Sequence, residues 1–199
     1  MAVLTSMTYL EAISEILTNV GLLPVNGISS NPDVDKAVRM LAMSSRQIQS
    51  EGWNFNTDRS LRISPDASAG NIILPLDTMA VDTVGQSAYI NVTMRDNILL
   101  KTDNYDNTDP EVFSAAVYVD LIRYLEFERI PQPARYYITI KAARRFADSY
   151  LSSGTMHGFT LQEEQMARSA LEEMEGADGK YNMLKTAPYI RRRVVNGGF

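Results

Sequence analysis

Apolar residues recur at intervals of three and four positions in four stretches, two near each end of the chain. This spacing places them on one face of an α-helix, so the pattern predicts amphipathic helices over residues 8–20, 32–51, 134–151 and 160–175. In the second stretch the apolar stripe runs through Val34, Leu41, Ser45 and Ile48. Because each helix has a stripe to bury, we expect the four helices to pack in one layer.

Residues at the ends of these stretches support the assignment. They are Thr8 with Glu11, Asn31 with Pro32, Thr160 with Glu163, and the glycines Gly21, Gly52 and Gly176. The Thr–Glu pairs fit capping boxes, the Asn–Pro pair fits a helix start, and a glycine allows a left-handed stop. We therefore expect helix ends at these glycines and an extended chain after Gly176.

Between residues 53 and 121 the helical period disappears and short runs with alternating apolar and polar residues replace it. These runs predict strands over 53–56, 60–63, 72–74, 79–84, 88–94, 98–101 and 113–121. The separators are rich in Asn, Asp, Gly and Pro, which are turn residues. We expect a small antiparallel sheet or partial barrel of about five to seven strands. The run 113–121 also suits a helix.

The order of elements predicts an α+β fold. It consists of a four-helix layer built from both chain ends, an inserted antiparallel β module and an extended C-terminal arm. The expected boundaries are residues 1–52 and 124–184 for the two halves of the helical part, 53–123 for the β module and 185–199 for the arm.

Charge is distributed unevenly along the 199 residues. The chain has a net charge of −5, but residues 185–199 carry +4 and no acid, which leaves −9 on the rest. An acidic body is a poor general binder of nucleic acid, whereas a basic arm can dock on an acidic partner. We expect a soluble protein, because a membrane-spanning apolar run and a signal peptide are both missing from the sequence.

The sequence offers little for catalysis or for binding a cofactor. It has no cysteine and one histidine, His157, and it lacks phosphate-loop, nucleophile-elbow and HExxH motifs. The remaining candidates are paired carboxylates that could cleave a glycosidic bond. They are Glu126 with Glu128, and Asp103, Asp106 and Asp109 in a loop that also loosely resembles a cation-binding loop. Turn chemistry and a solvated surface explain these acids as well.

Two basic features have both a plain and a functional interpretation. Arg144 and Arg145 lie beside the apolar stripe of the third helix, where their stems can cover the edge of the core or form ion pairs between subunits. Residues 185–199 mix three arginines with apolar residues, which fits either a disordered tail or a segment that orders against a partner.

Several stretches resemble the tail tubular protein A family of short-tailed bacteriophages. They are the first helix with GLLPV after it (8–25), RQIQSEGWNFN (46–56), FERIPQPARYYITIKAARRF (127–146), LQEEQMARSALEEME (161–175) and YNML (181–184). They keep the order and spacing of the family, whereas residues 60–115 are similar only in the type of element.

The resemblance implies a non-enzymatic structural virion protein that needs no cofactor. Members form a ring of twelve subunits around the DNA channel, between the portal and the tail nozzle (tail tubular protein B), with a surface for the tail fibre. Such a protein is made in the host cytoplasm and ends in the virion tail. The ring encloses double-stranded DNA without binding it specifically, and there is no membrane partner.

The resemblance and the patterns together suggest three groups of site residues. The arm that grips the portal is expected to use Tyr189, Ile190, Arg191, Arg192, Arg193 and Phe199. Arg144 and Arg145 are candidates for the subunit interface. The junction between helical and β parts is expected to depend on Arg46, Gln47, Gly52, Trp53 and Phe55, with Trp53 as a wedge in the core. The alternatives are a virion-associated glycan or peptidoglycan hydrolase that uses the paired carboxylates, and a cytoplasmic regulatory binding module.

Overall fold

The fold was analysed in a computed structural model, which describes residues 6–28, 31–103, 109–150 and 161–186. The chain divides into two compact units. We name them the helical unit (Met1–Leu41 and Pro131–Phe199) and the sheet unit (Ala42–Ile130). Helices and antiparallel strands are both present, so the predicted α+β class is confirmed.

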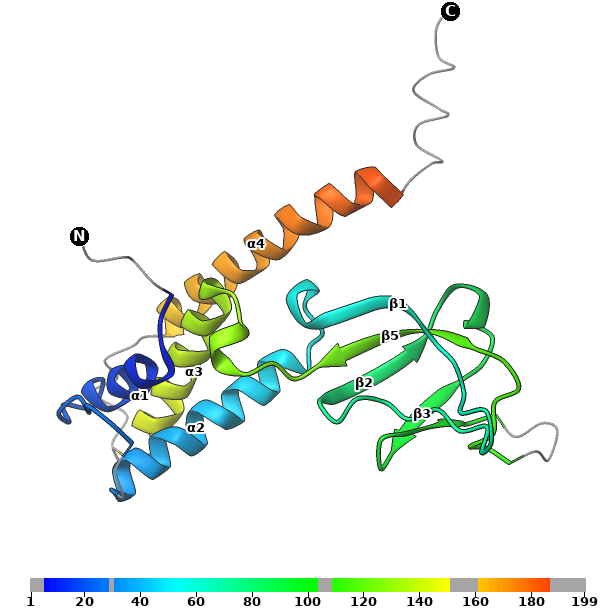
Figure 1. The fold of residues 1–199 in the computed structure, drawn as a ribbon. Helices are drawn as coiled ribbons and strands as arrows, with labels where there is room; N and C mark the ends of the chain where they lie inside the picture. Colours follow the sequence, from blue (N-terminus) through cyan, green and yellow to red (C-terminus); the bar gives the residue numbers. More distant parts are fainter. Residues whose placement is uncertain (1–5, 29–30, 104–108, 151–160, 187–199) are drawn as a thin grey trace, which may run out of the picture. The chain divides into compact units, whose positions relative to one another are not determined.

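Helices α1 (Tyr9–Thr18), α3 (Gln132–Tyr150) and α4 (Leu161–Thr186) lie in the helical unit, together with the first part of α2 (Pro32–Gln49) (Figure 1). Helix α3 packs against both α1 and α4. The core of this unit is built from the predicted stripes, including Ile13, Ile16, Tyr137 and Phe146, which are almost fully buried. The amphipathic pattern therefore identified the helices and their buried faces.

The predicted caps form where they are described. Glu11 N donates to Thr8 Oγ1 over 3.2 Å while Thr8 N donates to Glu11 Oε2 over 2.7 Å, which is a complete capping box. Asp33 N donates to Asn31 Oδ1 over 2.9 Å at the start of α2. Thr160 lies outside the described residues.

The expected helix end at Gly176 is wrong. Helix α4 continues through this glycine to Thr186, so the segment that we expected to be extended is helical as far as that residue. A glycine inside a helix costs only about 1 kcal/mol relative to alanine, which the rest of a long helix can offset.

In the sheet unit, β5 (Val117–Arg123) is the central strand of a three-stranded antiparallel sheet, between β1 (Thr57–Ile63) and β2 (Thr78–Thr83). A hairpin of β3 (Val92–Arg95) and β4 (Ile98–Lys101) forms a second sheet. Its turn residues Asp96 and Asn97 have φ values of 49° and 61°, as the turn composition predicts. Short 3₁₀ helices are found at Asn54–Asn56, Gly85–Ser87 and Phe127–Arg129.

Several predicted strands are misplaced. Residues 53–56 form a 3₁₀ turn, residues 72–74 contribute one isolated bridge from Ile73 to Ile98, and the strand expected at 113–121 begins four residues later. The run 88–94 is a strand only from Val92. In most of these cases the apolar residues are buried, as Ile72, Leu74 and Phe113 are. Alternation thus reported which side chains face the core, but a loop can bury alternate residues without forming a ladder.

Candidate interaction site

The stretch 46–56 connects α2 to β1 and is the most specific part of the family resemblance. Helix α2 ends at Gln49, and Gly52 follows with φ +76°. A Cβ atom at Gly52 would lie 2.7 Å from Ile122 Cδ1 of β5. The turn therefore needs glycine both for its backbone conformation and for this close approach.

Gln49 is completely buried and ties the end of α2 to the segment that follows β5. Its Oε1 accepts a hydrogen bond from Leu125 N over 2.7 Å, and its Nε2 donates to Leu125 O over 2.9 Å. The same Nε2 donates to Ser45 Oγ over 2.9 Å. The amide side chain thus pairs with both backbone groups of Leu125, as a neighbouring strand would.

Asn56 forms the second half of this connection. It is 2% exposed, and its Nδ2 donates to Gln49 O and to Arg123 O, both over 2.8 Å. Its Oδ1 accepts from Trp53 N over 2.9 Å. Buried amides that are satisfied in this way hold a single geometry, because breaking one bond leaves a buried polar group without a partner. We name Gln49 and Asn56 the junction amides.

Trp53 is half-buried, not the fully buried wedge that the sequence suggested. Its indole Nε1 donates to Ile48 O over 2.7 Å, which satisfies a carbonyl near the end of α2. Of the other residues named for the junction, Arg46 and Gln47 are exposed, and Phe55 is half-buried.

The sequence analysis named the correct stretch but missed the two residues that hold it. Gln49 lies four residues after Ser45 and eight after Leu41, so it falls on the apolar stripe of α2. A polar side chain on such a stripe is a readable sign of a buried hydrogen-bond network. Asn56 had no comparable sign, because the turn at 54–56 was predicted to be a strand.

Arg123, beside the junction, binds two carboxylates. Its Nε and Nη2 donate to Asp77 over 2.8 and 2.6 Å, and its Nη1 donates to Asp58 over 3.0 Å. These hydrogen bonds from Arg123 lower the pKa of Asp77. The group links β5 to β1 and to the residue before β2.

The arginines proposed for the subunit interface are half-buried on α3. Arg144 forms an ion pair with Glu164 of α4 in the same chain, and its Nε is buried without a hydrogen-bond partner in the described structure. This pair supports the plain interpretation for one arginine, and the role in a subunit interface stays a prediction. Tyr189, Ile190, Arg191, Arg192, Arg193 and Phe199 lie outside the described residues.

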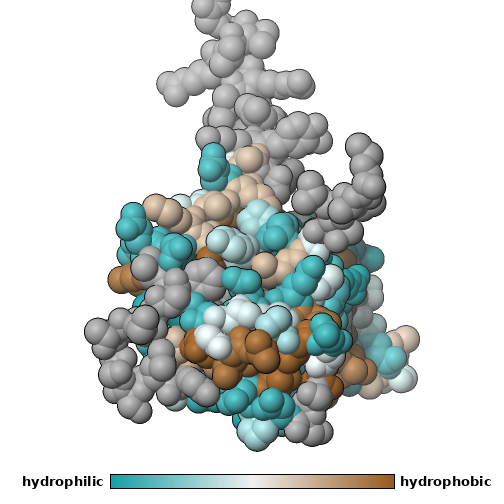
Figure 2. Space-filling model, turned by 90° about the vertical axis from the view of Figure 1, so that its left-hand side faces the viewer, coloured by the Kyte–Doolittle hydropathy of each residue, from teal (hydrophilic) through white to brown (hydrophobic). Residues whose placement is uncertain are grey.

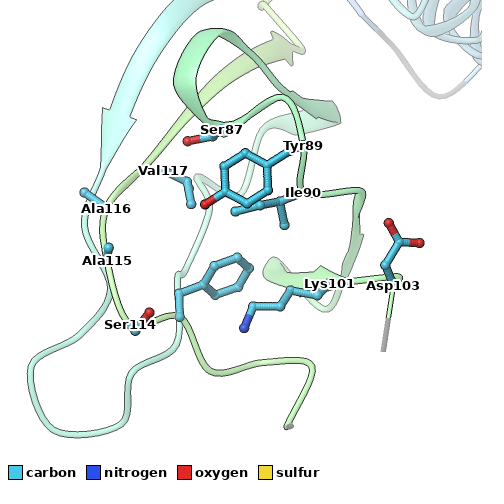
Figure 3. Close-up of a pocket in the computed structure, with 10 residues that line it drawn as sticks. Ser87, Tyr89, Ile90, Lys101, Asp103, Ser114, Ala115, Ala116 and Val117 are labelled. Carbon is cyan, nitrogen blue, oxygen red and sulfur yellow. The ribbon is translucent and has the colours of Figure 1, made fainter. Parts of the chain in front are cut away.

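A hollow of about 340 Å³ opens on the sheet unit between the 3₁₀ turn at Gly85–Ser87 and the segment before β5. Figure 3 shows Tyr89 and Ile90 on one side, Ala115 and Ala116 on the facing segment, and Asp103 at the far end. Lys101 Nζ donates to Val112 O over 2.6 Å and lies 5.0 Å from the centre of the Phe113 ring. Tyr89 is 81% exposed, so an aromatic surface is offered at the rim.

The carboxylates considered for catalysis show no shared site in the described structure. Asp103 accepts a hydrogen bond from Asn91, and Asp109 Oδ1 accepts from Glu111 N, while Asp106 and His157 lie outside the described residues. Within the described ranges no three acidic, His or Cys residues come together as a metal site would require. Nor does any helix there combine the length and the apolar character needed to cross a bilayer.

The comparisons with known proteins agree with the resemblance of the junction and the helices. The model of the tail tubular protein family matches residues 10–181, which include nearly all of the described chain and both units. A search of the curated proteins found no match. Since the family model covers well over half of the sequence, the chain belongs to the tail tubular protein family.

Proposed function

We propose that this structural protein of the phage tail is a ring-forming head–tail adaptor. It joins the portal to the tail nozzle and offers an attachment surface for the tail fibre. The observation that carries the proposal is the family match across both units, combined with large apolar side chains exposed on each of them. An adaptor must meet different neighbours, so it needs apolar surface to bury in more than one place.

The exposed apolar residues are distributed between the units. On the helical unit they are Leu23, Ile28, Tyr136, Leu161 and Met166, and on the sheet unit Met43, Leu61, Ile73, Leu76, Tyr89 and Val112. Figure 2 shows one face of the molecule, on the side where α1 lies in Figure 1, with a brown apolar area among hydrophilic residues.

The loop after α1 is a good candidate for such a contact because its shape is fixed. Ser14 Oγ donates to Val25 O and accepts from Val25 N, both over 3.2 Å. Leu23, within this loop, is 85% exposed. An apolar side chain that is held out on an ordered loop loses little conformational freedom when a partner covers it.

In this proposal the basic arm, residues 185–199, binds the portal. Its charge of +4 on a chain of net charge −5 and its apolar residues Tyr189, Ile190 and Phe199 suit an acidic surface with apolar pockets. Arg144 and Arg145 are proposed to lie at the subunit interface. The acidic body would form a channel that repels a passing DNA duplex, so the ring encloses DNA without holding it.

The arm is tested by deleting residues 185–199 and measuring binding to purified portal by sedimentation. We expect binding to fall at least about tenfold, because the arm supplies the proposed charge complementarity. A matched control replaces only Arg191, Arg192 and Arg193 by glutamine, which keeps the length of the chain and should reproduce most of the loss. Undiminished binding by both variants would contradict the role of the arm.

A further inference from the structure

The three-stranded sheet has one packed and one open face. Along β5, Val117, Val119 and Leu121 are buried in the apolar core of the sheet unit, whereas the alternate residues Tyr118, Asp120 and Ile122 are only half-buried. The strand register puts Ala80 opposite Ile122 and Asp82 opposite Asp120. Directly paired residues share a face, so these four side chains belong to the open face.

A groove of about 220 Å³ lies on this open face and ends at the junction. It is lined by Gly52, Ala80 and Ile122 along its floor and by Glu51, Asp82 and Asp120. None of the residues that line it is basic. We name it the acidic groove.

Two of the acids face each other across neighbouring strands. Asp120 Oδ1 accepts from Ser60 N over 2.7 Å and Asp82 Oδ1 accepts from Thr83 N over 2.9 Å, so each carboxylate is oriented by a backbone amide. Like charges directly opposite in a sheet are unfavourable. A cationic side chain placed between them would remove this repulsion.

The opposite charge is found on β1, at the edge of the same sheet. Five consecutive residues, 58–62, are exposed, among them Arg59, Leu61 and Arg62. Arg59 is oriented by a hydrogen bond of 2.6 Å to Asn54 Oδ1. In the described structure β1 pairs only with β5, so its other edge is free of any strand. We name Arg59, Leu61 and Arg62 the basic edge.

The backbone of β1 is poorly suited to receive another strand. The register shifts between Asp58 and Leu61, and Ser60 has φ +52°. Such a bulge twists an edge away from further pairing. A partner would therefore meet the side chains of the basic edge and not a ladder of backbone hydrogen bonds.

We propose that the basic edge of one copy docks into the acidic groove of a second copy of this chain. Arg59 and Arg62 approach Glu51, Asp82 and Asp120, while Leu61 covers the apolar floor at Ala80 and Ile122. The two surfaces differ, so the contact is head-to-tail and closes into a ring when the rotation between copies allows it. The inference rests on the proposed ring and names the surfaces that build it.

Cysteine cross-linking tests the contact directly, because the chain has no cysteine of its own. Copies with Leu61→Cys and copies with Ala80→Cys, distinguished by a mass tag, are mixed and oxidised. We expect the mixed dimer to form at least about tenfold faster than either homodimer, and added salt to slow it, because exposed charges are screened. The reactivity of each thiol toward a small reagent corrects for differences in its pKa.

A charge exchange then identifies the residues. Arg62→Glu in the copies with Leu61→Cys, or Asp82→Lys in the copies with Ala80→Cys, should each slow the mixed cross-link about tenfold, because like charges are then opposed. Both changes together should restore it, since the pair is present with its signs reversed. Both residues are exposed, and unchanged melting temperatures would show that the variants fold.

The outcomes separate this inference from the proposed function. A wild-type ring on the portal, with mixed cross-links no faster than homodimers or no restoration by the double exchange, would overturn the contact and leave the adaptor standing. A fast and charge-dependent cross-link without any ring on the portal would support the contact and count against the adaptor. A mixed dimer that never extends to larger species would show a two-fold pairing and overturn the head-to-tail arrangement.

Discussion

The replacement of Gln49 by alanine is the sharpest test of how the junction is held. The side chain is completely buried and makes three hydrogen bonds, two to Leu125 and one to Ser45. The substitution removes all three and leaves the N–H and C=O of Leu125 without these partners. Leu125 itself is half-buried, so water replaces the lost bonds only in part.

The expected cost follows from these contacts. Three hydrogen bonds at about 1 kcal/mol each, with the incomplete hydration of Leu125, give about 3 kcal/mol. The loss of buried methylene groups adds about 1 kcal/mol. We therefore expect Gln49→Ala to lower the free energy of unfolding by about 4 kcal/mol, a large fraction of the stability of an ordinary domain.

The measurement is urea unfolding followed by tryptophan fluorescence. Trp53 is the one tryptophan in the sequence and lies in the junction, so the signal reports on the sheet unit. The free energy comes from the midpoint and the slope of the transition. The matched control is Gln47→Ala, the same substitution at an exposed position of the same helix, which should change stability by no more than about 0.5 kcal/mol.

If Gln49→Ala and Gln47→Ala had equal effects, the junction amides would not hold the end of α2 to Leu125 as we infer. A large effect at Gln49 alone would confirm that a buried polar network, and not the half-buried Trp53, determines the geometry there.

Three further predictions concern backbone, charge and capping. Gly52→Ala should cost about 2 kcal/mol more than Gly21→Ala in unfolding free energy: both glycines have positive φ, but only Gly52 would place its new methyl group against a β5 side chain; equal costs would argue against the close approach. The pKa of Asp77 is lowered in the folded state by Arg123, so this carboxylate stabilises the fold above its ordinary pKa of 3.8 and the stabilisation is lost as pH falls further. Asp77→Asn should therefore flatten the acid limb of a stability-versus-pH curve, by no more than about 1 kcal/mol because the side chain is 37% exposed; an unchanged limb would contradict the assignment. Thr8→Ala should cost about 1 kcal/mol in thermal unfolding through loss of the capping box, whereas Thr8→Ser should retain most of the stability.

The sequence predicted those features that depend on a few neighbouring residues. The capping box of Thr8 with Glu11, the glycine turn at Gly52 and the left-handed turn at Asp96 and Asn97 are local, and each was found. The buried faces of the helices followed from the 3.6-residue period, because a helix keeps its stripe on one side wherever it packs.

Features that depend on distant partners were predicted less well. Whether residues 72–74 and 113–116 form strands is decided by pairing with segments far along the chain, and the alternation of side chains does not report it. The continuation of α4 past Gly176 likewise reflects the whole helix and not one residue. The acidic groove could not be foreseen, since the register of β2 against β5 brings Asp82 opposite Asp120.

Electron microscopy of the protein mixed with purified portal tests the central claim most directly. The adaptor account predicts a ring of copies seated on one face of the portal, with twelve subunits around an open channel. Portal particles that remain bare at a large excess of the protein, in a buffer of low ionic strength, would contradict it.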